Sequence, residues 1–279
     1  MTRSTIPMPQ RGTPEVEWQR AGAATDTTLP DTTPVVEAIL ERLPALPVGS
    51  VVLDLACGTG QPTFVLARDR PGLKVLGVDV TPVLIEQAQE KARANSVQNA
   101  SFGVMSVDQL ELEDRSMDAA ISHFGLLQEG NLAASGHELA RVLAPGAPFS
   151  FATFDDMALN TLMSTIERIL SGHVPADTLP DFDYLTRLAV PGLRERVLRE
   201  ARLEQFHTAI FRWSVPLPSF DAVWQIASGP VPFARAFDAL DSADVGRVRS
   251  DLEDAVSQYR NDGGAFVFPM ACRLFWGHR

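Results

Sequence analysis

The stretch VLDLACGTG, residues 52–60, joins a strand-like apolar run to a loop of small residues. Asp54 interrupts the apolar run, and Gly58 and Gly60 follow it within six residues. A nearly continuous apolar run is typical of a strand that is covered on both faces. Glycine lets another molecule approach the backbone closely, because it has no side chain. The stretch therefore predicts a buried strand that ends in a ligand-binding loop.

Strands and helices alternate around this stretch. Apolar runs predict strands at 50–56, 73–80, 100–107, 117–124 and 147–154. The segments between some of them have the spacing and end residues of helices, at 61–70, 81–95 and 131–146. Repeated strand–helix–strand units favour an α/β fold with a doubly wound, mostly parallel sheet. Two late strands, near 204–215 and 265–276, would bring this Rossmann-like sheet to seven strands.

The rest of the chain surrounds this predicted core. Residues 1–33 are rich in Thr, Pro and Arg and are predicted to form a flexible N-terminal arm. Residues 34–279 are predicted to form a single domain. Helical patterns interrupt the strands at about 156–203 and 216–263. We expect these two insertions to form a helical lid over the sheet.

Composition excludes several classes of function. The net charge of -11 and the lack of a basic cluster argue against a nucleic-acid partner. No apolar run reaches the roughly 18 residues of a membrane span, so we expect a cytoplasmic protein. Two cysteines provide no disulfide framework, and five scattered histidines predict no metal site. Nothing in the sequence indicates the oligomeric state.

The spacing of Gly60 and Asp79 is typical of an adenosine-containing cofactor. Ligands of doubly wound sheets bind beyond the carboxyl ends of the strands. Asp79 ends the second predicted strand, 19 residues after Gly60, where a carboxylate can accept the hydroxyls of a ribose. The third glycine of a dinucleotide fingerprint is replaced by Thr63, and a P-loop lysine is absent. The cofactor is therefore expected to be another adenosine derivative.

Four ordered motifs identify the resemblance. VLDLACGTG resembles motif I of the class I S-adenosylmethionine (SAM) methyltransferases. Later stretches resemble the second, third-to-fourth and fifth strand regions of that family, namely VLGVDVTPVLIEQAQEKA, SVDQLELEDRSMDAAISHFGLL and ELARVLAPGAPFSFATF. The similarity covers about residues 35–155 and extends weakly to FPMACRLFWG near the C-terminus, which is similar to the ends of small-molecule and quinone methyltransferases. The resemblance implies SAM as cofactor, S-adenosylhomocysteine as product, and no metal.

The resemblance also implies a role for individual residues of the cofactor site. Asp54 would bind the methionine ammonium group, and the loop with Ala56, Gly58 and Gly60 would pack against the cofactor. Asp79 would bind the ribose and Val80 the adenine. The acid that commonly receives the adenine amino group falls at Ser106, a departure from the family pattern. Asp108 or the backbone N–H of Val107 are the alternatives at this contact.

Methyl transfer mainly requires alignment of the reactants. A base that accepts a proton is needed only if the nucleophile is a weak acid, such as a hydroxyl group. His123, at the end of the fourth predicted strand, is the candidate base; the alternative is that it only packs on the cofactor. Glu129 and Asp155 are weaker candidates. We expect the acceptor pocket to be walled by apolar residues of the insertions, namely Met163, Phe220, Trp224, Phe233 and Phe237.

The sequence therefore predicts methyl transfer to O, N or C of a small, largely apolar metabolite, in natural-product biosynthesis. The main alternative keeps SAM and the fold but catalyses a cyclisation or rearrangement. A non-catalytic SAM-binding module and a nicotinamide-dependent oxidoreductase are further alternatives.

Overall fold

A computed structural model describes residues 30–126, 132–180, 190–203, 205–229 and 232–279. Its sheet contains β1 (Val51–Leu55), β2 (Lys74–Asp79), β3 (Ala100–Val104), β4 (Ala119–His123), β5 (Pro148–Phe154), β6 (Gln205–Leu217) and β7 (Phe266–His278). The strand order is β3-β2-β1-β4-β5-β7-β6. Strands β1 to β5 pair in parallel, and β7 runs antiparallel to both β5 and β6. The predicted seven-stranded, mostly parallel sheet is confirmed.

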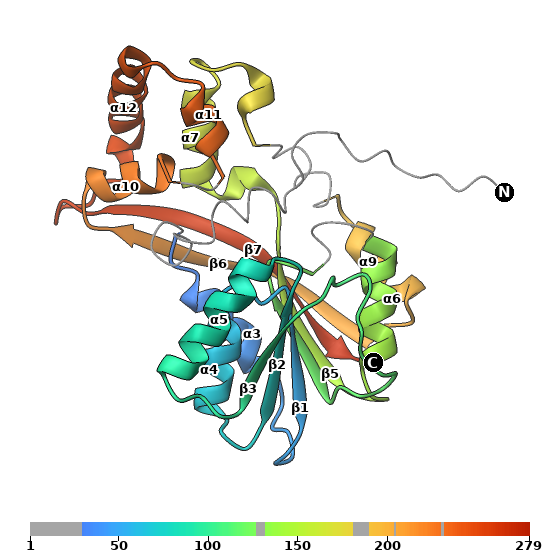
Figure 1. The fold of residues 1–279 in the computed structure, drawn as a ribbon. Coiled ribbons are helices and arrows are strands. Elements are labelled where there is room, and N and C mark those ends of the chain that lie inside the picture. The colour runs from blue at the N-terminus through green and yellow to red at the C-terminus, as the bar shows by residue number, and fades with distance from the viewer. Residues whose placement is uncertain (1–29, 127–131, 181–189, 204, 230–231) are drawn as a thin grey trace.

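Helices cover both faces of this sheet (Figure 1). One face carries α3 (Thr33–Glu41), α4 (Gln61–Asp69) and α5 (Pro82–Ala94), and the other carries α6 (Leu132–Val142) and α9 (Leu193–Glu200). Strands β1, β4 and β5 are buried almost throughout, whereas the edge strands β3 and β6 expose many residues. This explains why the central strands have continuous apolar runs and the edge strands do not.

Four helices form a separate cap over the far end of the β6–β7 pair (Figure 1). They are α7 (Thr161–Leu170), α10 (Phe220–Ala227), α11 (Ala234–Asp238) and α12 (Ser242–Val256). Short 3₁₀ turns flank them, at Met157–Leu159, Ala176–Thr178 and Ser257–Tyr259. Their apolar side chains share one core with the distal parts of β6 and β7. The amphipathic stripes of the insertions are therefore used to build this core.

Helix α9 departs from the prediction that all of 156–203 belongs to a lid. It packs beside α6 on the sheet, and its Val197 and Leu198 lie in the same core cluster as Leu139 and Phe275. Its apolar face is thus buried in the core beside the sheet and not in the core of the cap. In the described residues, no helix is long and apolar enough to span a membrane.

The strand order reverses between β1 and β4, where β2 and β3 lie to one side of β1 and β5 lies to the other side of β4. Crevices at such switch points are the usual ligand sites of doubly wound sheets. The connection after β3, residues 105–118, contains turns and no helix. The ends of β1, β2, β3 and β4 therefore define the region in which to look for a site.

Candidate functional site

The loop after β1 bends sharply, with three residues in the left-handed region. Ala56, Gly58 and Gly60 have φ angles of 55°, 56° and 89°. The N–H of Cys57 donates to the carbonyl of Val78 at 2.9 Å, which ties the loop to β2. The left-handed conformation favours glycine and is uncommon at alanine, so the loop is held in its shape by its surroundings.

The two glycines of this loop serve different purposes. A Cβ atom at Gly60 would lie 2.9 Å from ring atoms of both Phe64 and Phe102. Those rings contact each other, with centroids 5.3 Å apart. A Cβ atom at Gly58 would meet nothing within 4 Å. A side chain at position 60 would thus collide with the protein's own rings, whereas one at position 58 would enter open space. That both glycines let the loop pack against the cofactor stays a prediction.

Asp54 is a buried carboxyl group at the base of the loop. Its exposed fraction is 0%, and its Oδ2 accepts the Thr63 hydroxyl of α4 at 2.6 Å. Its Oδ1 has no hydrogen-bond partner among the described residues. Burial raises the pKa of Asp54 to about 7, against the lowering effect of the Thr63 hydrogen bonds. A buried oxygen without a donor suits a cationic group, because an ammonium would both donate a hydrogen bond and stabilise the ionised carboxylate.

Asp79 at the end of β2 is 7% exposed and organises two segments of backbone. Its Oδ2 accepts the N–H of Gly58 at 2.9 Å, and its Oδ1 accepts the N–H of Thr81 at 2.9 Å. Each carboxylate oxygen can accept more than one hydrogen bond, so these contacts leave capacity for the hydroxyls of a ribose. The next residue, Val80, is 45% exposed and offers an apolar surface beside the carboxylate.

The segment after β3 lies next to Asp79. The N–H of Met105 donates to the carbonyl of Asp79 at 3.0 Å. Ser106 and Asp108 lie together, because the Ser106 hydroxyl donates to Oδ1 of Asp108 at 2.5 Å. Both are half-buried, as is Val107 between them. The structure thus brings all three alternatives for the adenine contact to the same edge as Asp79.

His123 ends β4 at the same edge of the sheet. Its ring contacts Phe124, with centroids 4.6 Å apart, and its Nε2 is inaccessible and without a partner among the described residues. Burial lowers the pKa of His123 to about 4. The ring is therefore neutral at pH 7, able to form a hydrogen bond but weak as a base. Two residues on, a Cβ atom at Gly125 would lie 2.0 Å from the Cβ of Ala56, so the loops after β1 and β4 are in tight contact.

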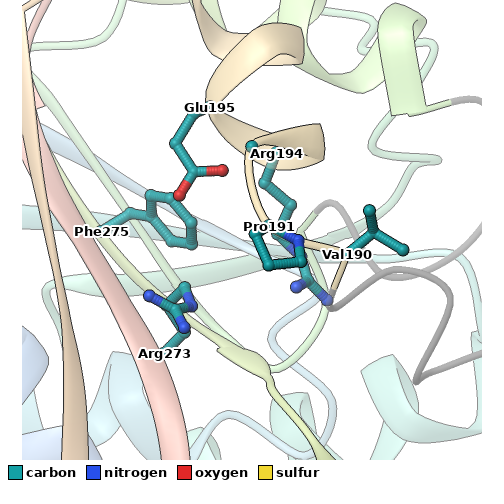
Figure 2. Close-up of a pocket in the computed structure, with 7 residues that line it drawn as sticks. Val190, Pro191, Arg194, Glu195, Arg273 and Phe275 are labelled. Carbon is teal, nitrogen blue, oxygen red and sulfur yellow. The ribbon is translucent and has the colours of Figure 1, made fainter.

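A second polar group lies at the end of β5. Asp155 is 4% exposed and forms an ion pair with Arg273 of β7, with 2.8 Å between Oδ2 and Nη2. Arg273 lines a cavity of about 70 Å³ at the start of α9, together with Arg194 and Glu195 (Figure 2). This volume is far below the roughly 300–1,000 Å³ of typical small-molecule sites. The cavity therefore cannot hold a whole cofactor or metabolite.

The residues expected to wall an acceptor pocket lie in the core of the cap. Met163 and Phe233 are 8% and 0% exposed, and Phe220, Trp224 and Phe237 pack around them. Phe220 and Trp224 also form cation–π contacts with Arg249, whose guanidinium lies 5.1 Å from both ring centroids. Their contact with an acceptor stays a prediction. Glu129 and the expected arm up to residue 29 lie outside the described residues.

Comparison with known proteins agrees with this arrangement. Residues 52–146 match a family model described as a methyltransferase domain. A 2-phytyl-1,4-naphtoquinone methyltransferase of Trichormus variabilis is 38% identical over 109 residues, which are 38% of this chain and 47% of that protein. The matched part of the chain, residues 52–146, has the sequence of a methyltransferase domain. The chain spans about half the length of the curated relatives it matches.

Solved structures share the fold over most of the chain. A protein described as a methyltransferase from an antibiotic biosynthesis pathway of Anabaena variabilis has a TM-score of 0.62 at 20% identity and covers 90% of this chain and 98% of its own. The cyclase SpnF has a TM-score of 0.53 at 20% identity and covers 88% of this chain and 80% of its own. At these identities the likeness concerns the fold alone.

The resemblance to SAM methyltransferases makes SAM the cofactor to compare with these residues. Its chemical groups fit the residues of the site: a buried oxygen without a donor at Asp54, open space beside Gly58, and an exposed apolar surface at Val80. No group of three or more metal-binding side chains occurs among the described residues.

Sequence reasoning missed two features of the site. Ser122 donates its hydroxyl to the carbonyl of Leu55 at 2.7 Å and accepts the N–H of Leu126 at 3.0 Å, so it joins the loops after β1 and β4. Glu138 and Arg141 of α6 hold the segment after β3. An acid and a base three residues apart are visible in the sequence, but their partners are backbone groups that no sequence pattern marks.

Proposed function

We propose that this protein transfers the methyl group of SAM to an oxygen, nitrogen or carbon atom of a small, largely apolar metabolite. The observation that carries the proposal is the buried Oδ1 of Asp54 at the base of the loop after β1, to which no group of the described residues donates a hydrogen bond. The family match and the similarity to a quinone methyltransferase support methyl transfer as the reaction and a small molecule as the acceptor.

The proposed cofactor-binding roles are those that the resemblance implies, and the geometry of the site supports them. Asp54 binds the methionine ammonium, and Gly58 leaves room for the methionine tail beside the loop. Asp79 accepts the ribose hydroxyls in charge-assisted hydrogen bonds. Val80 packs on the adenine, and the segment Ser106–Asp108 contacts its amino edge. The cofactor, when bound, supplies an electrophilic methyl on a sulfonium.

The acceptor side is built from the ends of β4 and β5. A neutral His123 can hold the acceptor's nucleophilic atom by a hydrogen bond, because its Nε2 has no partner among the described residues; since this nitrogen is covered in the ligand-free protein, the acceptor reaches it only when the side chains over it move. Its low pKa makes it better suited to orienting that atom than to keeping a proton. The chain passes from the end of β5 through the turn at Met157–Leu159 into the cap, which connects the cap to this edge of the sheet. The reaction requires alignment of the two reactants at about 3–3.5 Å.

The proposal is tested with SAM that carries an isotopically labelled methyl group. The protein is incubated with the labelled cofactor and a panel of demethylated quinones, phenols and polyketide alcohols, and products are read by mass spectrometry. We expect one acceptor to gain one labelled methyl in step with formation of S-adenosylhomocysteine. An acceptor converted to an isomer of unchanged mass, with SAM intact, would overturn methyl transfer in favour of a cyclisation or rearrangement. His123→Ala is the matched variant, and Asp118→Asn, at the opposite end of β1, is the control.

A further inference from the structure

A pair of side chains on α6 clasps the connection between β3 and β4. Oε2 of Glu138 accepts the N–H of Leu110 at 2.7 Å, and Nη2 of Arg141 donates to the carbonyl of Leu110 at 2.9 Å. Nη1 of Arg141 also donates to the carbonyl of Leu112 at 2.7 Å and to Oδ1 of Asp114 at 2.8 Å. We call Glu138 and Arg141 the α6 clasp. It fixes both backbone polar groups of Leu110 at once.

The geometry of the α6 clasp requires an arginine. Besides its contacts with the connection, Arg141 donates from Nε to Oε1 of Glu138 at 2.7 Å and from Nη2 to Oε2 at 2.8 Å. All five guanidinium N–H donors are thereby used. A lysine has three donors on one atom and cannot reach both carbonyls and both carboxylates together. The ion pair also holds the pKa of Glu138 below its usual range.

The α6 clasp holds the chain just after the segment expected to contact the adenine. Leu110 is two residues after Asp108, and it is itself 5% exposed. At the other end of the segment, the N–H of Met105 is bonded to the carbonyl of Asp79. The three residues 106–108 are thus held from β2 at one end and from α6 at the other. The segment itself forms a turn, in which the N–H of Gln109 donates to the carbonyl of Ser106 at 3.1 Å, and the two attachments fix where this turn lies relative to β2 and α6.

We propose that the α6 clasp is a positioning device that sets the selectivity of the site for adenine. This inference rests on the proposed binding of SAM. Glu138 and Arg141 act through the Ser106–Asp108 segment and do not touch the cofactor. If the clasp opens, the segment keeps its attachment to β2 but loses the fixed distance between its polar groups and the base. Recognition of the adenine amino group then weakens more than binding of the ribose and the methionine tail.

The test measures binding of two ligands that differ only at the base, S-adenosylhomocysteine and S-inosylhomocysteine. Isothermal titration is performed on the full chain with wild type, Arg141→Lys and Glu138→Gln. Asp114→Asn is the matched control, because it removes a charge and weakens only the outermost contact of Arg141, to a side chain that is 72% exposed. Thermal unfolding of each variant reports whether the fold is retained. Glu138→Gln keeps an acceptor for Leu110 and serves if Arg141→Lys does not fold.

We expect wild type to bind the adenine compound at least about tenfold more tightly than the inosine compound, as one hydrogen bond at the base allows. Arg141→Lys should weaken binding of the adenine compound about tenfold and of the inosine compound less than about threefold, whereas Asp114→Asn should change neither. Unchanged affinities in Arg141→Lys, or equal losses for both compounds, would overturn the inference and leave the clasp a purely structural feature. Wild type that binds neither compound would instead refute the proposed function.

Discussion

Replacing Asp54 by asparagine should stabilise the free protein and at the same time weaken cofactor binding. Burial raises the pKa of this carboxyl from 3.8 to about 7 in the folded state. Because the folded-state pKa lies above the unfolded one, the unfolded chain loses its proton first as the pH rises from about 4. Stability therefore falls between pH 4 and pH 7, and the loss is complete above about pH 7. This rise in the pKa of Asp54 lowers the free energy of unfolding above pH 7 by about 4 kcal/mol.

Asparagine at this position does not ionise, so the free energy of unfolding of the variant does not fall between pH 4 and pH 7 on account of this residue. Its amide can still accept the Thr63 hydroxyl, but a buried NH₂ without an acceptor costs about 1–2 kcal/mol. We expect Asp54→Asn to unfold about 5–10 °C above wild type at pH 8. The gain should shrink as the pH falls, pass through zero near pH 5 and become a loss of about 1–2 kcal/mol at pH 4, where the Asp54 carboxyl of the folded wild type is protonated and only the cost of the buried amide remains. Thermal unfolding of the ligand-free protein across this pH range measures the effect.

The same substitution removes the negative charge that the methionine ammonium would meet. A hydrogen bond to a charged group contributes about 1.5–3 kcal/mol, so affinity for S-adenosylhomocysteine should fall about 10- to 100-fold. Asp118→Asn is the control, because it alters the net charge equally but lies at the opposite end of β1, where Oδ2 accepts the N–H of Val51 at 2.8 Å. A variant that is less stable than wild type at pH 8, or that binds within threefold of it, would refute the reasoning.

Three further substitutions test the remaining contacts of the site. Asp79→Ala should weaken S-adenosylhomocysteine binding at least about tenfold, because it removes the ribose acceptor and also frees the N–H of Gly58; an unchanged dissociation constant would contradict the ribose assignment. His123→Ala should lower kcat about tenfold or more with less than a threefold change in cofactor affinity, whereas equal losses in rate and affinity would make His123 a cofactor contact only. Because the pKa of His123 is about 4, the pH profile of the wild-type rate should show no inflection from this ring between pH 5 and 8. Gly125→Ala should lower both the melting temperature and the cofactor affinity, because its Cβ would lie 2.0 Å from that of Ala56. Gly246→Ala in α12 is the control, because a Cβ there meets nothing within 4 Å, and it should raise the free energy of unfolding by about 0.5–1 kcal/mol. Thermal unfolding and titration compare the two variants, and a Gly125→Ala that changes neither quantity would contradict the tight contact.

The sequence was most informative about the sheet. Each of the five parallel strands was predicted within three residues of its observed ends, because strands buried on both faces need continuous apolar runs. The two late strands were found as well, although each extends two residues further than predicted, to Leu217 and His278. Asp54 and Asp79 could be placed because they lie in the last two residues of β1 and β2, and the geometry of parallel sheets brings such strand ends to one edge.

The sequence was least informative where several chain segments meet. The role of Gly60 depends on Phe102, which is 42 residues away and reaches the loop only through the pairing of β2 with β3. The apolar stripes of the insertions could not reveal whether they line a pocket or fill a core, because both use the same side chains. Likewise, helix α9 has the pattern of any amphipathic helix, and only its contacts with α6 assign it to the sheet.

A crystal structure with S-adenosylhomocysteine tests the central claim most directly. We expect the ligand at the carboxyl ends of β1, β2 and β3, with its ammonium nitrogen about 2.7–3.1 Å from Oδ1 of Asp54 and its ribose hydroxyls on Asp79. A ligand bound elsewhere, or an ammonium that makes no contact with Asp54, would contradict the account.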